Sequence, residues 1–198
     1  MCVSCVCNTE VMKTSAISRM INPHVSTPYE DLNAFRLVIL SDRIVAPTTI
    51  VLRNVPITEA QGYEIVEMCV DWNAEAQEYV TTGLAVQGGT GAPVNGVLLR
   101  KIPVDKYKHL AVSKFLLLKT GDDEYRPFDV SSFGALNTAA KDGPTDANLK
   151  YVARIYRVSK HISDSPRKAV ADAFGFTDRT ASYWINHARE RGYMRDDE

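Results

Sequence analysis

Residues 144–194 carry start and stop signals for three short helices, and these signals constrain the fold more than any other feature of the chain. Thr145 and Thr177 suit the position just before a helix, because a threonine hydroxyl accepts a hydrogen bond from a first-turn amide. Ser165-Pro166 combines such a capping residue with a proline at the first helical position. Gly175 stands where a helix must end in a left-handed residue. The sequence therefore predicts one helix after Thr145, one over 166–174 and one over 178–191, which Gly192 ends.

The apolar residues of these segments repeat with helical spacing. In the first segment they fall at positions i, i+3, i+4 and i+7 and form one stripe on one helix face. These residues are Leu149, Val152, Ala153 and Tyr156, and the corresponding set in the third segment is Ala181, Trp184, Ile185 and Ala188. Ala171 is small enough to let the last two helices approach, and Gly175, four residues later, makes a sharp turn. This spacing predicts a helix-turn-helix.

The residues left for the outer face of the third helix are polar. Those predicted to read bases are Arg179, Ser182, Tyr183 and Asn186. Arginine pairs with guanine edges and asparagine with adenine edges in the major groove, which is wide enough to admit a helix. The pattern therefore indicates a DNA-reading helix. The alternative is a plain three-helix interaction domain with a basic face.

Charge is unevenly distributed along the chain, although the net charge is only −1. Residues 144–195 hold ten Lys/Arg and five Asp/Glu, residues 1–143 hold 13 basic and 16 acidic residues, and residues 196–198 form an acidic tail of −3. The +5 segment coincides with the predicted helices, as a nucleic-acid-binding surface requires. The residues predicted to contact phosphates are Lys150, Arg154, Arg167, Lys168, Thr177 and Arg189, together with the backbone amides at the start of the third helix.

The preceding part of the chain has the composition of a β-rich domain. Runs of β-branched and other apolar residues are separated by short turn-prone breaks, which favours an antiparallel meander. The predicted strands are 35–40, 48–55, 63–72 and 78–86, and the predicted helical segments are 97–102 and 104–118. The expected fold class is α+β, with an N-terminal antiparallel β-rich domain followed by helix and a C-terminal all-α domain of three helices.

Changes in composition predict the domain boundaries. Residues 1–30 have little apolar periodicity and are predicted to be disordered. Residues 31–120 form the β-rich domain that ends in a helical segment, and residues 121–143, with their turn-forming Gly, Asp, Ser and Pro, form a linker. Residues 144–195 form the predicted helix-turn-helix domain, and residues 196–198 form the acidic tail.

The run Lys168–Ile185 (KAVADAFGFTDRTASYWI), followed by Ala188–Met194 (ARERGYM), resembles the C-terminal helix-turn-helix of DNA-binding proteins common in actinobacteria, their phages and mobile elements. Such proteins often pair a small N-terminal β-rich region with a helical segment of the Leu98–Pro103 (LLRKIP) kind. The resemblance covers residues 144–194 and is vaguer over 35–118. It implies a DNA-binding regulator and identifies no target gene.

A cysteine cluster near the N-terminus is the strongest candidate for a metal site. Cys2, Cys5 and Cys7 form Cys-x-x-Cys-x-Cys, and Cys-x-x-Cys is the usual half of a zinc or iron–sulfur site. A full site needs four ligands, and a translation start at Met12 or Met20 would remove the motif. We therefore expect no metal and no cofactor.

No other constellation predicts catalysis. Gly88–Gly91 is rich in glycine but lacks the Gly-Lys-Ser/Thr that would hold phosphate and magnesium. Asp105 and His109 are i, i+4 neighbours on a helix, yet no nucleophile pairs with them in sequence. His161 and His187 lie among the predicted DNA-binding helices, where exposure or phosphate contact explains them. The chain is therefore not expected to be an enzyme.

The predicted function is sequence-specific transcription regulation, with double-stranded DNA as partner. A single such module buries little surface, so a homodimer through the β-rich domain is the expected source of further specificity. No apolar run reaches the length of a membrane span and no secretory signal is evident, so the chain is expected in the cytoplasm. The main alternative is a phage or mobile-element adaptor that binds a host protein complex. A DNA-processing enzyme such as a recombinase is a weaker one, since 35–118 shows no catalytic cluster.

Overall fold

A computed structural model describes residues 25–26, 36–90, 92–121, 125–130, 136 and 139–194 of the 198-residue chain. The chain divides into two compact units, residues 1–39 with 45–127 and residues 40–44 with 128–198. Most of the segment predicted to be disordered, the cysteine cluster Cys2, Cys5 and Cys7, and the acidic tail lie outside the described residues. Within 1–30, Val25–Ser26 form a short strand, β1.

An antiparallel sheet of four strands dominates the N-terminal unit. Its order is β1, β4 (Thr49–Pro56), β5 (Tyr63–Asn73) and β6 (Glu78–Gly88), so the last three strands form the expected meander. The register pairs Ile50 with Val70 and Leu52 with Met68 across β4 and β5. All four of these side chains are fully buried and form part of the core. The strand predictions for 48–55, 63–72 and 78–86 are confirmed.

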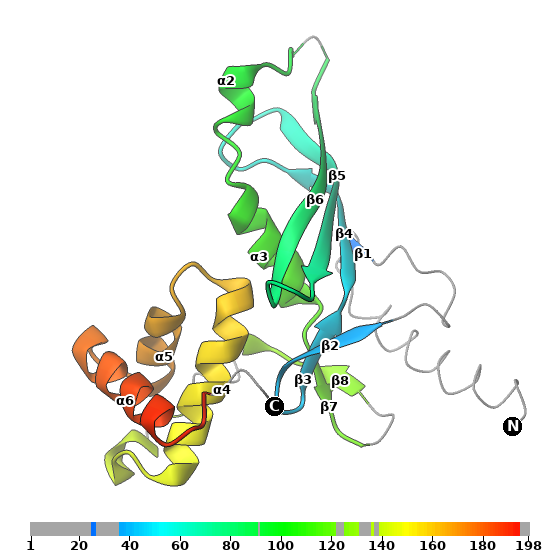
Figure 1. Cartoon of the computed structure of the whole chain (residues 1–198). Helices are drawn as coiled ribbons and strands as arrows, with labels where there is room; N and C mark the ends of the chain where they lie inside the picture. The colour runs from blue at the N-terminus through cyan, green and yellow to red at the C-terminus, as the bar shows by residue number, and fades with distance from the viewer. Residues whose placement is uncertain are drawn as a thin grey trace, which may run out of the picture. The chain divides into compact units, whose positions relative to one another are not determined.

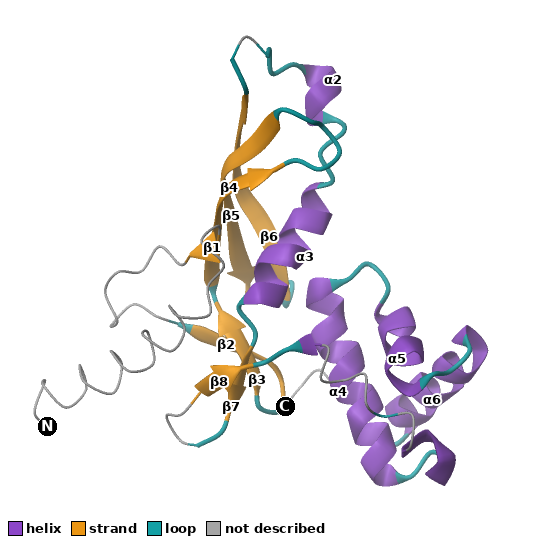
Figure 2. Ribbon diagram, turned by 180° about the vertical axis from the view of Figure 1, so that it is seen from behind, coloured by secondary structure: helices purple, strands orange, loops and turns teal. Residues whose placement is uncertain are grey.

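Helix α3 (Val104–Lys114) packs on this sheet, where it contacts β4 and β6. The two opposite views in Figures 1 and 2 show it lying along one face of the strands. Tyr107 is 2% exposed, and its hydroxyl accepts a hydrogen bond from the backbone N–H of Thr58 and bonds the carboxylate of Glu59, each at 3.0 Å. The hydrogen bond from Lys106 is the main cause that lowers the pKa of Glu59 to about 2. These contacts fix α3 to the turn that follows β4.

The two helices predicted over 97–102 and 104–118 both end earlier in the structure. The first, α2 (Gly96–Leu99), begins after Asn95, whose Oδ1 accepts from the amides of Val97 and Leu98 at 3.1 and 3.0 Å. It ends well before 102, because a residue preceding a proline, here Pro103, disfavours helical backbone. The prediction of helix over 104–118 was wrong beyond Lys114, since Leu117–Lys119 form strand β7.

A second sheet of four short strands has the order β2 (Leu37–Ser41), β3 (Ile44–Pro47), β7 and β8 (Tyr125–Pro127). β2 confirms the strand expected over 35–40. β3 and β8 were not predicted, and β8 lies in the expected linker 121–143, which also holds the 3-10 helix η3 (Ala139–Asp142). β7 is a strand because it pairs antiparallel with β8, with Leu117 opposite Pro127. This pairing joins two segments whose sequences carry no local strand signal.

Three helices make up most of the described C-terminal unit: α4 (Asp146–Ile162), α5 (Pro166–Phe174) and α6 (Asp178–Glu190). The predicted Thr145 cap is confirmed, because its side chain accepts a hydrogen bond from the amide of Asn148. Ser165 holds the predicted N-cap position of α5, but its hydroxyl makes no capping bond. The fold is therefore α+β, with antiparallel sheets followed by three helices.

Across the part of the chain that the structure covers, no helix has the length and apolar character needed to cross a membrane.

Candidate nucleic-acid interface

The three C-terminal helices enclose one small core, and each of them packs against the other two. Trp184 of α6 is only 5% exposed. Its ring centroid lies 5.6 Å from that of Phe174 and 4.6 Å from that of Phe176, and the two phenylalanine rings stack at 5.2 Å. This aromatic cluster joins the end of α5, the following turn and the middle of α6. It fixes the orientation in which α6 presents its opposite face.

The connection between α5 and α6 is three residues long, Gly175–Thr177. Gly175 has φ +68° and ψ +31°, the left-handed conformation that the sequence predicted. The N–H of Phe176 donates to the carbonyl of Ala171 at 2.8 Å, which closes the end of α5. Thr177 then caps α6 by accepting a hydrogen bond from the amide of Thr180 at 3.3 Å. The turn therefore sets the direction of α6 within three residues.

Substitution of Gly175 with alanine tests this turn. We expect Gly175→Ala to lower the free energy of unfolding of the helical unit by about 1–2 kcal/mol, because a Cβ is disfavoured in left-handed backbone. Urea denaturation of the full chain, followed by circular dichroism at the helical band, measures the loss. Gly96→Ala is the matched control, since a Cβ at Gly96 meets nothing within 4 Å and the backbone there is not left-handed. An equal loss in both variants would contradict the role of Gly175.

Helix α6 has one buried face and one polar face. The four predicted apolar residues are all buried: Ala181, Trp184, Ile185 and Ala188. The residues predicted to read bases lie at i, i+3, i+4 and i+7 on the other side, so the structure brings them together on one face. Arg179, Tyr183 and Asn186 are exposed, and Ser182 is half-buried. Tyr183 is 58% exposed, so most of its ring is open to a partner.

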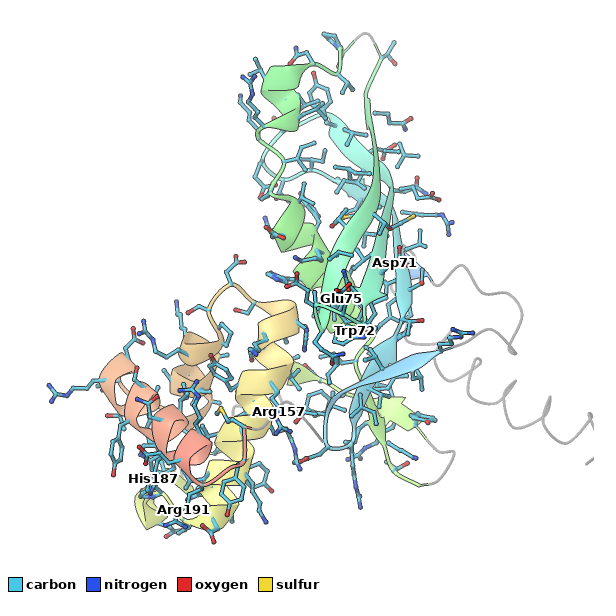
Figure 3. All side chains as sticks on the ribbon, in the orientation of Figure 1. Asp71, Trp72, Glu75, Arg157, His187 and Arg191 are labelled. Carbon is cyan, nitrogen blue, oxygen red and sulfur yellow. The ribbon has the colours of Figure 1, made fainter. Side chains whose placement is uncertain are left out.

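Several of these side chains have neighbours within the helix. Ser182 Oγ donates to the carbonyl of Asp178 at 2.9 Å, and Asn186 Oδ1 accepts from Arg189 at 3.0 Å. Tyr183 stacks on His187, with ring centroids 5.9 Å apart, and Figure 3 marks His187 on the distal part of α6. Among the residues that the structure describes, Arg179 has neither an ion-pair nor a hydrogen-bond partner. Its guanidinium can therefore bind a ligand without first breaking a described contact.

The residues predicted to contact phosphates fall into two groups. Arg167 belongs to α5, and its NH2 lies 3.4 Å from the carboxylate of Asp178 at the start of α6. Lys168, the next residue of α5, and Thr177, the N-cap of α6, are exposed. Lys150 and Arg154 instead line a cavity with Gly192 and Tyr193, just beyond the other end of α6. A helix of 13 residues is about 20 Å long, so the two groups lie at opposite ends of α6. Arg189 is exposed in its last turn.

Three comparisons, with protein-family models, curated protein sequences and solved structures, give no match for this chain.

Arg157 was not among the predicted site residues. It follows Lys150 by seven positions and Arg154 by three, so helical spacing alone places the three cations on one face of α4. Arg154 is paired with Asp42, whose Oδ2 lies 3.1 Å from Nε and 2.7 Å from NH2. No local sequence signal reveals this pair, because 112 positions separate the two residues.

The described residues contain no group of three His, Cys, Asp or Glu side chains that could hold a metal ion. Cys69 of β5 is half-buried, and burial together with Glu67 and Asp71 raises the pKa of its thiol. A thiol with a raised pKa is a poor nucleophile and a poor ligand at neutral pH.

Proposed function

We propose that the C-terminal unit is a helix-turn-helix and that the chain is a sequence-specific DNA-binding transcription regulator. The observation that carries this proposal is the polar face of α6, whose four candidate base-reading residues lie opposite a fully apolar buried face. The three-residue turn at Gly175 and the aromatic cluster hold α6 against α5 in a fixed orientation. A helix held in this way can enter the major groove.

Each residue of the polar face has a chemical role in this proposal. Arg179, near the start of α6, would pair with the O6 and N7 acceptors of a guanine. Asn186 would exchange its contact with Arg189 for the N6 and N7 edge of an adenine. Ser182 would add a single hydrogen bond, and the exposed ring of Tyr183 would contact a thymine methyl group.

Phosphate contacts would come from the turn and from both ends of α6. Arg167 of α5 reaches the start of α6 through Asp178, and Lys168 follows it in the chain. The first-turn amides and the helix dipole at this end of α6 also favour an anion. The ion pair of Arg167 with Asp178 is more than half exposed, and such pairs contribute little, so replacing the carboxylate with a phosphate costs little. Arg189 would contact the backbone from the last turn.

Salt dependence tests this proposal. If Arg167, Lys168 and Arg189 each neutralise one phosphate, a rise from about 50 to about 200 mM salt should weaken binding on the order of 40-fold. Fluorescence anisotropy with the full chain and a labelled duplex measures the slope. Replacing Lys168 with glutamine should make the slope shallower by about one unit. Failure of any duplex to bind at low salt would contradict the proposal and favour the protein adaptor.

The β-rich unit would supply the second contact that a single module needs. Among the described strands, β6 lies at an edge of its sheet and is eleven residues long. Edge strands are surfaces through which two copies of a chain pair. We propose a homodimer through this unit, which would place two α6 helices on two half-sites of one operator.

A further inference from the structure

A cavity of about 340 Å³ lies within the C-terminal unit, between α4 and the turn that follows α6. Lys150, Arg154 and Arg157 line it from one face of α4. Ser41 at the end of β2, Asp42 in the turn that follows it, and Gly192–Tyr193 complete the wall. All of these residues belong to the same compact unit. Figure 3 marks Arg157 on α4 at this place.

The basic side chains of the cavity are held in place by specific contacts. Arg154 donates through Nε and NH2 to one oxygen of Asp42. Arg157 NH2 donates to the carbonyl of Tyr193 at 2.8 Å, and Lys150 Nζ lies 5.6 Å from the centroid of the Tyr193 ring. Tyr193 is itself fixed, because its N–H donates to the carbonyl of Ala188 at 3.0 Å.

The side chains that line this cavity include three cations and one carboxylate: Lys150, Arg154, Arg157 and Asp42. Like charges at i, i+3 and i+4 on one helix face destabilise the helix. A negatively charged ligand would reduce this repulsion.

We propose that this cavity binds a small phosphorylated ligand. Arginine pairs with phosphate oxygens through two parallel hydrogen bonds, which suits Arg154 and Arg157. Lys150 supplies a third, more mobile charge at the exposed edge. The volume lies within the range of small-molecule sites and suits a pyrophosphate or a sugar phosphate.

Ser41 gives independent support for a ligand. It is 3% exposed, and within the described part of the chain its hydroxyl has no hydrogen-bond partner. A buried hydroxyl without a partner costs free energy, which a phosphate oxygen would recover.

The site lies at the end of α6 opposite to Arg167 and the first-turn amides. A ligand in the cavity would thus contact the turn that ends α6, about 20 Å from the start of that helix. The proposal does not depend on DNA binding. It assigns Lys150 and Arg154 to a small anion rather than to the DNA backbone.

Isothermal titration of the full chain at low ionic strength tests the site, with inorganic pyrophosphate and ribose 5-phosphate as separate probes. We expect saturable binding of at least one probe at one site. Arg154→Gln and Lys150→Gln should each weaken binding about tenfold, because each removes a charge-assisted contact. Lys160→Gln, which removes an exposed cation of α4 outside the cavity, should change the affinity less than about twofold.

Two further variants distinguish a specific binding site from nonspecific attraction of anions to positive charge. Asp42→Asn should tighten binding severalfold, since it removes the carboxylate that competes for Arg154. Ser41→Ala should weaken binding without lowering the melting temperature of the free protein, because the hydroxyl makes no hydrogen bond among the described residues. No saturable binding by the wild-type chain, or equal loss in Lys160→Gln and Arg154→Gln, would overturn the proposal. Displacement of the bound probe by duplex DNA would overturn the small-ligand assignment as well.

Discussion

Replacing Trp184 with alanine is expected to destabilise the C-terminal unit by about 3–5 kcal/mol, the largest effect of any single substitution in α6. The indole is 5% exposed and contacts both Phe174 and Phe176. Its removal leaves a cavity at the point where α5, the turn and α6 meet. Chemical denaturation of the full chain, followed by circular dichroism, measures the loss.

Tyr183→Ala is the matched control for Trp184→Ala, because it removes an aromatic ring from the adjacent position. Tyr183 is 58% exposed, so the change in stability should stay within about 0.5 kcal/mol. Trp184→Phe, which keeps most of the apolar volume, should lose less than the alanine variant. Equal losses at Trp184 and Tyr183 would mean that α6 buries a different face.

Replacing Arg179 with glutamine is expected to weaken specific DNA binding by about 1–3 kcal/mol, which corresponds to a loss of roughly 5- to 150-fold. The loss should be confined to duplexes with the preferred base at one position, because in the proposed binding mode the guanidinium reads one base pair. Binding to unrelated duplexes should change much less. Anisotropy titrations with the preferred duplex and with a duplex altered at that base pair measure both effects.

Arg126→Gln is the control for Arg179→Gln. Arg126 is an exposed arginine of β8, and its substitution changes the net charge by the same amount. It should leave the affinity for the preferred duplex unchanged within about twofold. A similar loss in both variants would show that only overall charge matters and would exclude base reading by Arg179.

The three C-terminal helices could be predicted because their signals are local. Thr145, Gly175 and Thr177 act at helix ends through contacts with residues at most a few positions away. The apolar spacing of α6 likewise placed Trp184 on the buried face and Tyr183 on the exposed face. The Ser165 cap was right in position only, since its hydroxyl accepts no hydrogen bond from the first turn of α5.

The second sheet could not be predicted because its pairing is not local. The turn that leads into β3 has Asp42 at positive φ and is followed by Arg43 rather than by the glycine of the usual Asn-Gly or Asp-Gly hairpin signal. Leu117 and Leu118 continue an apolar run with no helix-breaking residue, so they resembled the last turn of α3. They form a strand because β7 pairs with β3 on one side and with β8 on the other, and β8 lies in a segment rich in turn-forming residues.

The polar face of α6 could be predicted from the sequence, whereas the basic cavity beyond its other end could not. The polar face of α6 follows from residue spacing alone, and the structure groups Arg179, Ser182, Tyr183 and Asn186 on it. The basic cavity requires Asp42 and Tyr193 to meet the cations of α4, and those contacts depend on how distant segments pack. The charge count identified residues 144–195 as basic, but it could not show that their cations form two groups at opposite ends of α6.

Selection from a random duplex library tests directly whether the exposed face of α6 reads a DNA sequence, as we propose. The full chain is incubated with the library at moderate salt, and the bound duplexes are amplified and sequenced over several rounds. We expect the wild-type chain to enrich one sequence, and we expect Arg179→Gln to lose the preference at one base pair of that sequence. Binding without any enriched sequence, or an enriched sequence unchanged by Arg179→Gln, would contradict base reading by α6.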